Sequence, residues 1–133
     1  MKKHKTKIMI VDDDKIFLEE LKAMLTSRGY QVKKFSDGDA SLQMVTKIKP
    51  DVILLDLKMK RKSGFQVAEE LKQLPEAANI PIIAMTGFYT EGQNPMLMKI
   101  FGMTTCLIKP FTPEQLINQI ESVLVQSNKK GGE

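Results

Sequence analysis

Residues 8–14 read Ile8-Met-Ile-Val-Asp-Asp-Asp14, four apolar residues followed at once by three aspartates. A short apolar run that stops against polar residues is typical of a strand buried in a parallel sheet. Similar runs recur at Val52–Leu55 and Ile82–Met85, and Leu107–Ile108 is a shorter version. Gln31–Phe35 is more polar and suits a strand at the edge of the sheet.

Helical patterns separate these runs. Ser63 with Gln66, and Thr112 with Gln115, have the capping-box form that marks the start of a helix. Alternating strands and helices imply right-handed crossovers and a sheet covered on both faces. We therefore expect an α/β fold of flavodoxin-like type, with a doubly wound five-stranded parallel sheet of order 2-1-3-4-5 in three α/β/α layers. Apolar residues recur at the spacing of one helix face at Phe17, Leu21, Met24 and Leu25, and at Leu116, Ile120, Val123 and Leu124.

Length and composition favour a single globular domain. The 133 residues are 42% hydrophobic and 27% charged, close to ordinary soluble domains. The net charge of +4 is concentrated near the ends, which predicts a basic tail at 1–6, a domain at 7–126 and a flexible tail at 127–133. Because the predicted domain is nearly neutral, we expect no direct binding of nucleic acid by this chain.

Cysteine content and hydropathy indicate the compartment. The chain has one cysteine, Cys106, which cannot form an internal disulfide. No apolar run approaches the roughly 18 residues of a membrane span, and aspartates interrupt the first run before a signal peptide could form. We therefore expect a cytoplasmic protein without a membrane role of its own.

Polar side chains stand where the predicted strands end. Asp12 and Asp13 follow the first strand, whereas Asp56, Thr86 and Lys109 end the third, fourth and fifth. In a doubly wound sheet the carboxyl ends of the strands form the functional edge. If the first and third strands are neighbours, three carboxylates lie close together and repel one another unless a cation neutralises them. Mg²⁺, which prefers oxygen ligands, fits this set.

Each of these residues alone is better explained by structure. Aspartates after a strand are frequently helix caps, and we expect Asp14 to cap the helix that follows it. A threonine or a lysine at a strand end is usually incidental. The functional hypothesis depends on their combination, because four strand ends each supply a polar group that phosphoryl transfer to a carboxylate needs.

The same segments resemble the receiver domains of two-component signalling, the family of the chemotaxis receiver protein. The resemblance covers about Lys7 to Val125. It implies a signalling phosphoacceptor that assists its own phosphoryl transfer and autodephosphorylation rather than an enzyme with an external substrate. The motifs that carry it are Ile8-Met-Ile-Val-Asp-Asp-Asp14, Asp51-Val-Ile-Leu-Leu-Asp56-Leu-Lys-Met59 with Ser63-Gly64, Ile82-Ile-Ala-Met-Thr86-Gly87 and Ile108-Lys109-Pro110-Phe111.

The resemblance also implies a magnesium site and a phosphodonor. Asp56 is the residue that receives the phosphoryl group, from a histidine kinase or a histidine phosphotransfer protein. By this resemblance, Asp13 would bind Mg²⁺ directly and Asp12 would bind it through a water. Asp56 and the backbone carbonyl of Lys58 complete the protein's share of the coordination.

Two further residues have implied roles around the phosphoryl group. Lys109 grips it, with a cis peptide bond between Lys109 and Pro110, and Thr86 moves toward it when it arrives. Phosphorylation then changes a partner-binding surface, whose target is unknown. The chain is expected to be a monomer or to dimerise on phosphorylation.

The chain departs from the family pattern at several positions. Lys60 stands where proline is usual and begins a basic loop at 60–62, which we interpret as solvated, with docking to an acidic partner as the alternative. Cys106 replaces the aromatic residue that swings inward in many receivers, and we expect its thiol to pack rather than to sense redox state. Gly92 and Pro95 are expected to delay or shorten the fourth helix.

Two other functions remain open at this point. Aspartate-dependent phosphatases use similar chemistry but carry a second aspartate two residues after the nucleophile, where this chain has Lys58. A receiver-like scaffold that is not phosphorylated is the other alternative, favoured by the missing aromatic at Cys106 and opposed by the intact strand-end residues.

Overall fold

The computed structural model describes residues 5–87 and 95–131, with side chains through residue 127 and excluding that of Pro95. The chain alternates strands and helices in the order β1 (Lys7–Val11), α1 (Lys15–Ser27), β2 (Gln31–Phe35), α2 (Gly38–Ile48), β3 (Val52–Asp56), α3 (Gly64–Gln73), β4 (Ile82–Thr86), α4 (Pro95–Ile100), β5 (Thr105–Ile108) and α5 (Pro113–Gly131).

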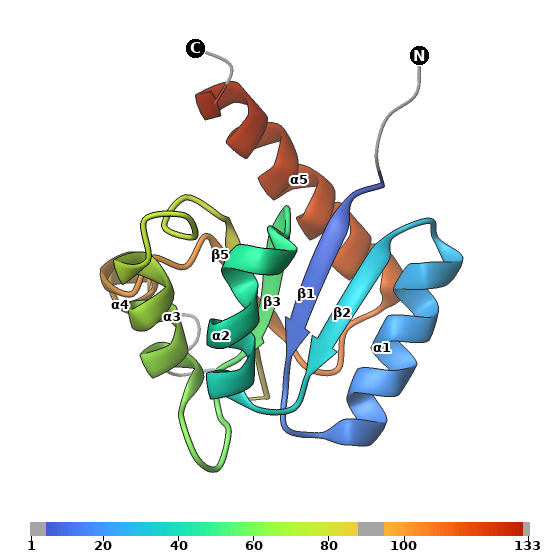
Figure 1. The fold of residues 1–133 in the computed structure, drawn as a ribbon. Coiled ribbons are helices and arrows are strands. Elements are labelled where there is room, and N and C mark those ends of the chain that lie inside the picture. The colour runs from blue at the N-terminus through green and yellow to red at the C-terminus, as the bar shows by residue number, and fades with distance from the viewer. Residues whose placement is uncertain (1–4, 88–94, 132–133) are drawn as a thin grey trace.

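The strands form one parallel sheet of order β2-β1-β3-β4-β5, which confirms the predicted fold class (Figure 1). The polar strand β2 lies at an edge, as expected. Strand β5 begins at Thr105, two positions before the apolar run that predicted it. Thr105 and Cys106 are only half-buried at the other edge of the sheet, so hydropathy did not reveal them.

Alternate residues of the strands build a core on each face of the sheet. On β1, Ile8 and Ile10 pack with α1 and α5, whereas Met9 and Val11 pack with α2 and α3. Helix α4 packs on the same face of the sheet as α2 and α3, through Met98. The predicted α/β/α layering is therefore confirmed, and the sheet is buried on both faces.

Local signals in the sequence set the helix boundaries. The Asp14 carboxylate accepts a hydrogen bond from the Phe17 amide and caps α1, as predicted. Both predicted capping boxes are present: Ser63 and Gln66 exchange hydrogen bonds at the start of α3, and Thr112 and Gln115 do so at the start of α5.

The last two helices differ in length. Helix α4 has only 6 residues from Pro95, in keeping with a shortened helix, although Gly92 lies outside the described residues. Helix α5 continues to Gly131, into the stretch expected to be a tail from 127, so the domain boundary at 126 stays a prediction. Among the described residues, no helix combines the length and the hydropathy needed to cross a bilayer.

Candidate functional site

The register of the sheet brings the predicted site residues to one edge. Val11 pairs with Leu55, so the residues that follow them, Asp12 and Asp56, are neighbours across β1 and β3. Thr86 ends β4 beside Asp56 on β3, since Asp56 pairs with Met85. Three strand ends therefore converge, as expected for the carboxyl edge of a doubly wound sheet.

Asp12, Asp13 and Asp56 form a cluster whose carboxylate oxygens lie within 4.8 Å of one another. Asp12 and Asp56 are buried, with 1% and 6% of their surface exposed, whereas Asp13 is more open to solvent. The Asp14 amide donates to Asp12 at 2.9 Å, which fixes one carboxylate oxygen. Three carboxylate oxygens so close together could hold a hard divalent cation such as Mg²⁺.

Lys109 from the end of β5 supplies the positive charge of this cluster. Its ammonium lies 2.7 Å from Asp12 Oδ2 and 3.4 Å from Asp56 Oδ1. Burial opposes the charge on Lys109, but the hydrogen bond to Asp12 and the charges of Asp56 and Asp12 outweigh it, so its pKa is raised. The Lys109–Pro110 peptide bond is cis, as predicted, and the Lys109 amide donates to the Thr86 carbonyl at 2.7 Å.

Asp56 is held in an environment that disfavours its charge. Burial is the largest cause, and the neighbouring charge of Asp12 adds to it. Lys109 acts in the opposite direction but does not cancel these effects, so the pKa of Asp56 rises to about 6. A cation that enters the cluster would therefore stabilise the charged form of the Asp56 carboxylate.

The loop that joins β3 to α3 closes the site on the side of Asp13. The Lys60 amide donates to Asp13 Oδ2 at 2.9 Å. Gly64 starts α3 directly against β3: a Cβ there would lie 2.2 Å from the Asp56 carbonyl oxygen, so only glycine permits this approach. Lys58 lies in the same loop with its side chain exposed.

The chain matches known proteins along most of its length. The model of the response regulator receiver domain matches residues 8–121. PilH of Pseudomonas aeruginosa is 35% identical over 118 residues, which are 89% of this chain and 97% of that protein.

The chain belongs to the response regulator receiver domain family.

Solved receiver structures resemble this one closely. Vibrio cholerae chemotaxis protein CheY4 has a TM-score of 0.85 at 28% identity, covering 90% of this chain and 99% of that one. The receiver domain of the Pseudomonas aeruginosa sensor histidine kinase PA1611, with a magnesium ion coordinated in its active site cleft, has a TM-score of 0.82 at 26% identity, covering 91% and 98%. Several other curated relatives are longer, and the chain spans about half their length.

Family membership makes this chain a signalling module of two-component systems rather than a classical enzyme. Of the residues predicted for the receiver site, the structure brings Asp12, Asp13, Asp56 and Lys109 into one cluster. Thr86 is buried at the adjacent strand end.

Sequence reasoning missed one contact of Lys109. Phe17, assigned only to the apolar face of its helix, lies with its ring centroid 4.3 Å from the Lys109 ammonium. Phe17 also meets Phe111 edge to face at 6.1 Å. A cation over an aromatic face is stabilised electrostatically, so the ring helps to hold Lys109 at the cluster. The sequence offered one indication of this contact: Phe17 lies in the first turn of the helix that follows the three aspartates.

Cys106 has the environment of a packed thiol. It is half-buried against the core layer of α2 and α3, and burial raises its pKa to about 11. A thiol with so high a pKa carries almost no thiolate at neutral pH and reacts slowly with oxidants. This supports the interpretation of Cys106 as a packing residue.

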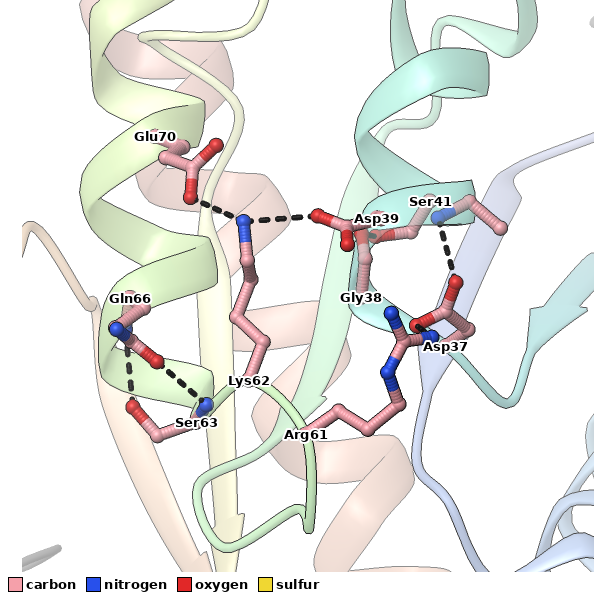
Figure 2. A network of polar contacts seen from close by, with 10 residues as sticks. Asp37, Gly38, Asp39, Ser41, Arg61, Lys62, Ser63, Gln66 and Glu70 are labelled. Atoms are coloured by element: carbon pink, nitrogen blue, oxygen red, sulfur yellow. Dashed lines mark hydrogen bonds and ion pairs between the residues drawn. The ribbon is translucent and has the colours of Figure 1, made fainter.

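In the basic loop at 60–62, Lys60 and Arg61 are exposed to solvent as expected, but Lys62 is not. Lys62 lies between Asp39 of α2 and Glu70 of α3, and Arg61 pairs with Asp37 (Figure 2). The side chain of Lys62 is only 22% exposed. The sequence placed these acidic residues far from the loop, and only the packing of α2 beside α3 brings them within reach.

Proposed function

We propose that this chain is a phosphoacceptor that receives a phosphoryl group on Asp56 from a histidine kinase or histidine phosphotransfer protein in the cytoplasm. The single observation that carries the proposal is the position of Asp56: a buried carboxylate beside Asp12 and Asp13, with Lys109 3.4 Å from its oxygen. A nucleophile, a metal-ligand set and a cation that can follow the transferred charge are thus in one place.

The carboxylate cluster fits Mg²⁺ by its chemistry. Asp13 would bind the ion directly, Asp12 through a water, and Asp56 and the Lys58 carbonyl would complete the protein ligands. When bound, Mg²⁺ neutralises the carboxylates and the oxygens of the phosphoryl group.

The transfer itself is carried by Asp56. A carboxylate oxygen of Asp56 attacks phosphorus, the bond from phosphorus to the donor histidine nitrogen breaks, and the electron pair remains on that nitrogen. Lys109 moves from its carboxylate partners to the phosphoryl oxygens, and the Thr86 hydroxyl donates a hydrogen bond to one of them. In the reset, water attacks phosphorus, inorganic phosphate leaves and the Asp56 carboxylate is regenerated.

Intact-mass measurement tests the proposal. The chain is incubated with a small acyl phosphate and Mg²⁺, and we expect one added base-labile phosphoryl group that EDTA prevents. Asp56→Asn removes the label. Asp51→Asn is the matched control, because Asp51 lies next to the opposite end of β3 and accepts a hydrogen bond from the Lys7 amide, so it should label normally. A labelled Asp56→Asn protein would refute the assignment.

Phosphate release from an ester and partner binding, measured beside the label, separate the alternatives. A phosphatase would continue to release phosphate from a generic ester after Asp56 is labelled. A scaffold would take up no label and bind its partner equally with and without phosphodonor.

A further inference from the structure

The loop from 57 to 63, here called the β3–α3 loop, is held at its outer end by two ion pairs of one lysine. The Lys62 ammonium lies 2.8 Å from Asp39 Oδ1 on α2 and 2.5 Å from Glu70 Oε2 on α3. Figure 2 shows the lysine between the two helices, with one carboxylate on each side. Lys62 therefore ties the loop to both helices at once.

The same loop meets the carboxylate cluster at its inner side. The Lys60 amide donates to Asp13 Oδ2 at 2.9 Å, and Gly64 donates to the Leu57 carbonyl at 3.0 Å. Lys58, whose carbonyl is a proposed ligand of Mg²⁺, lies between these two contacts. Only Arg61 separates Lys60, which contacts the site, from Lys62, which contacts the helices.

The surroundings of Lys62 limit its freedom. Helix α2 starts so close to α3 that a Cβ on Gly38 would lie 2.6 Å from Val67 Cγ2 and 3.7 Å from Lys62 Cδ. The hydrogen bonds to Asp39 and Glu70 also raise the pKa of Lys62, so it keeps its charge at neutral pH. Arg61 is far more exposed, at 76% against 22% for Lys62, and makes one longer ion pair.

We propose that Lys62 is a positioning residue of the magnesium site: by bridging Asp39 and Glu70 it holds the β3–α3 loop where the Lys60 amide meets Asp13. The inference rests on the proposed function, because it assigns Mg²⁺ to that cluster. Groups that orient metal ligands without touching the metal change affinity by about 10- to 100-fold when removed. Lys62 acts one step further out, so we expect a smaller effect.

The test compares matched lysine variants by calorimetric titration with Mg²⁺. Lys62→Met keeps the length of the side chain and removes its charge, and we expect Mg²⁺ affinity to fall about three- to tenfold. Lys62→Arg restores a cation that can bridge two carboxylates and should recover most of the affinity. Lys34→Met is the control, because Lys34 forms a surface ion pair with Glu19 at 3.0 Å away from the loop.

Hydrogen exchange of the Lys60 amide gives a readout besides affinity. In the metal-free protein we expect faster exchange in Lys62→Met than in the wild type, with unchanged exchange in the core strand β3. The double variant Asp39→Asn with Glu70→Gln removes both partners and leaves Lys62 in place. It should show the same changes, and it carries the test if Lys62→Met fails to fold.

The outcomes separate this inference from the proposed function. Wild-type affinity and wild-type exchange in Lys62→Met overturn the positioning role while the phosphoacceptor stands. An equal loss of affinity in Lys34→Met also overturns it, since the effect would then be one of general charge. A wild-type protein that binds no Mg²⁺ overturns the proposed function, and the inference with it.

Discussion

Two lysines of this protein each lie between two carboxylates, yet the two regions behave in opposite ways. Lys109 contacts Asp12 and Asp56, whose side chains are 1% and 8% exposed. Lys62 contacts Asp39 and Glu70, each 46% exposed. The pKa of Asp56 is raised to about 6, whereas the hydrogen bond from Lys62 lowers the pKa of Asp39.

Burial explains the difference. Around Lys109 the loss of hydration and the repulsion between neighbouring carboxylates exceed the attraction of one ammonium group. Around Lys62 water still solvates the carboxylates, so the lysine adds attraction at little cost. The buried arrangement therefore stores unfavourable charge that a cation or a phosphoryl group can relieve, and the exposed arrangement serves to hold structure.

The largest expected effect comes from breaking the buried arrangement. Lys109→Met leaves two buried carboxylates without their cation, and we expect it to lower the free energy of unfolding by about 3–4 kcal/mol without Mg²⁺. Urea unfolding measures this, and millimolar Mg²⁺ should recover part of the loss. Lys62→Met, measured in parallel, should shift the unfolding midpoint far less. Equal losses in the two variants would contradict the contrast.

The second effect is the pH dependence of the buried carboxylate. Because the pKa of Asp56 is raised from 3.8 to about 6 on folding, its contribution to stability is present below pH 3.8 and lost as pH rises through about 6. Asp56→Asn cannot ionise, so in EDTA it should gain about 2–3 kcal/mol over the wild type between pH 4 and 7.

In the exposed region around Lys62, the pH dependence of stability should have the opposite sign to that at Asp56. Because the pKa of Asp39 is lowered on folding, its charged form adds stability above the ordinary carboxyl pKa, and this stability is lost as pH falls. The stability of Asp39→Asn relative to the wild type should therefore fall as pH rises. Urea unfolding at a series of pH values checks both variants. A flat difference between Asp56→Asn and the wild type across this range would show that Asp56 is not strained by its surroundings.

The two regions also differ in how far the sequence foretells them. The buried cluster follows from periodicity together with a flavodoxin-like strand order: apolar runs locate the strands, and that order makes the first and third strands neighbours at the functional edge. The fold order and the clustering of Asp12, Asp13, Asp56 and Lys109 are thus predictable. Phe17 escaped because its apolar character explained it already as core.

The exposed region carried no comparable signal. The partners of Lys62 stand at positions 39 and 70, and their nearness depends on how α2 packs against α3. That packing is set by details such as Gly38, where a side chain would meet Val67. Charge along the chain indicates only that a loop is basic, so solvation was the natural interpretation and it was wrong for Lys62.

The smallest expected effect sharpens the comparison with salt. At about 1 M salt the screening length falls to about 3 Å, so exposed ion pairs weaken while buried ones persist. We expect exchange of the Lys60 amide to quicken about two- to threefold between 0.1 and 1 M NaCl in the metal-free protein, because the loop loses its Lys62 restraint. The Lys109 amide, which donates to the Thr86 carbonyl beside the buried cluster, should keep its protection.

The control for this measurement is Lys62→Met, whose Lys60 amide should exchange quickly at both salt concentrations because no charge remains to be screened. If salt quickens the Lys60 amide equally in Lys62→Met, the ion pairs do not restrain the loop. If the Lys109 amide responds as strongly as the Lys60 amide, the burial of Asp12 and Asp56 does not shield the ion pairs of Lys109 from salt. The contrast therefore requires that salt quickens exchange of the Lys60 amide only when Lys62 is charged, and that exchange of the Lys109 amide stays unchanged.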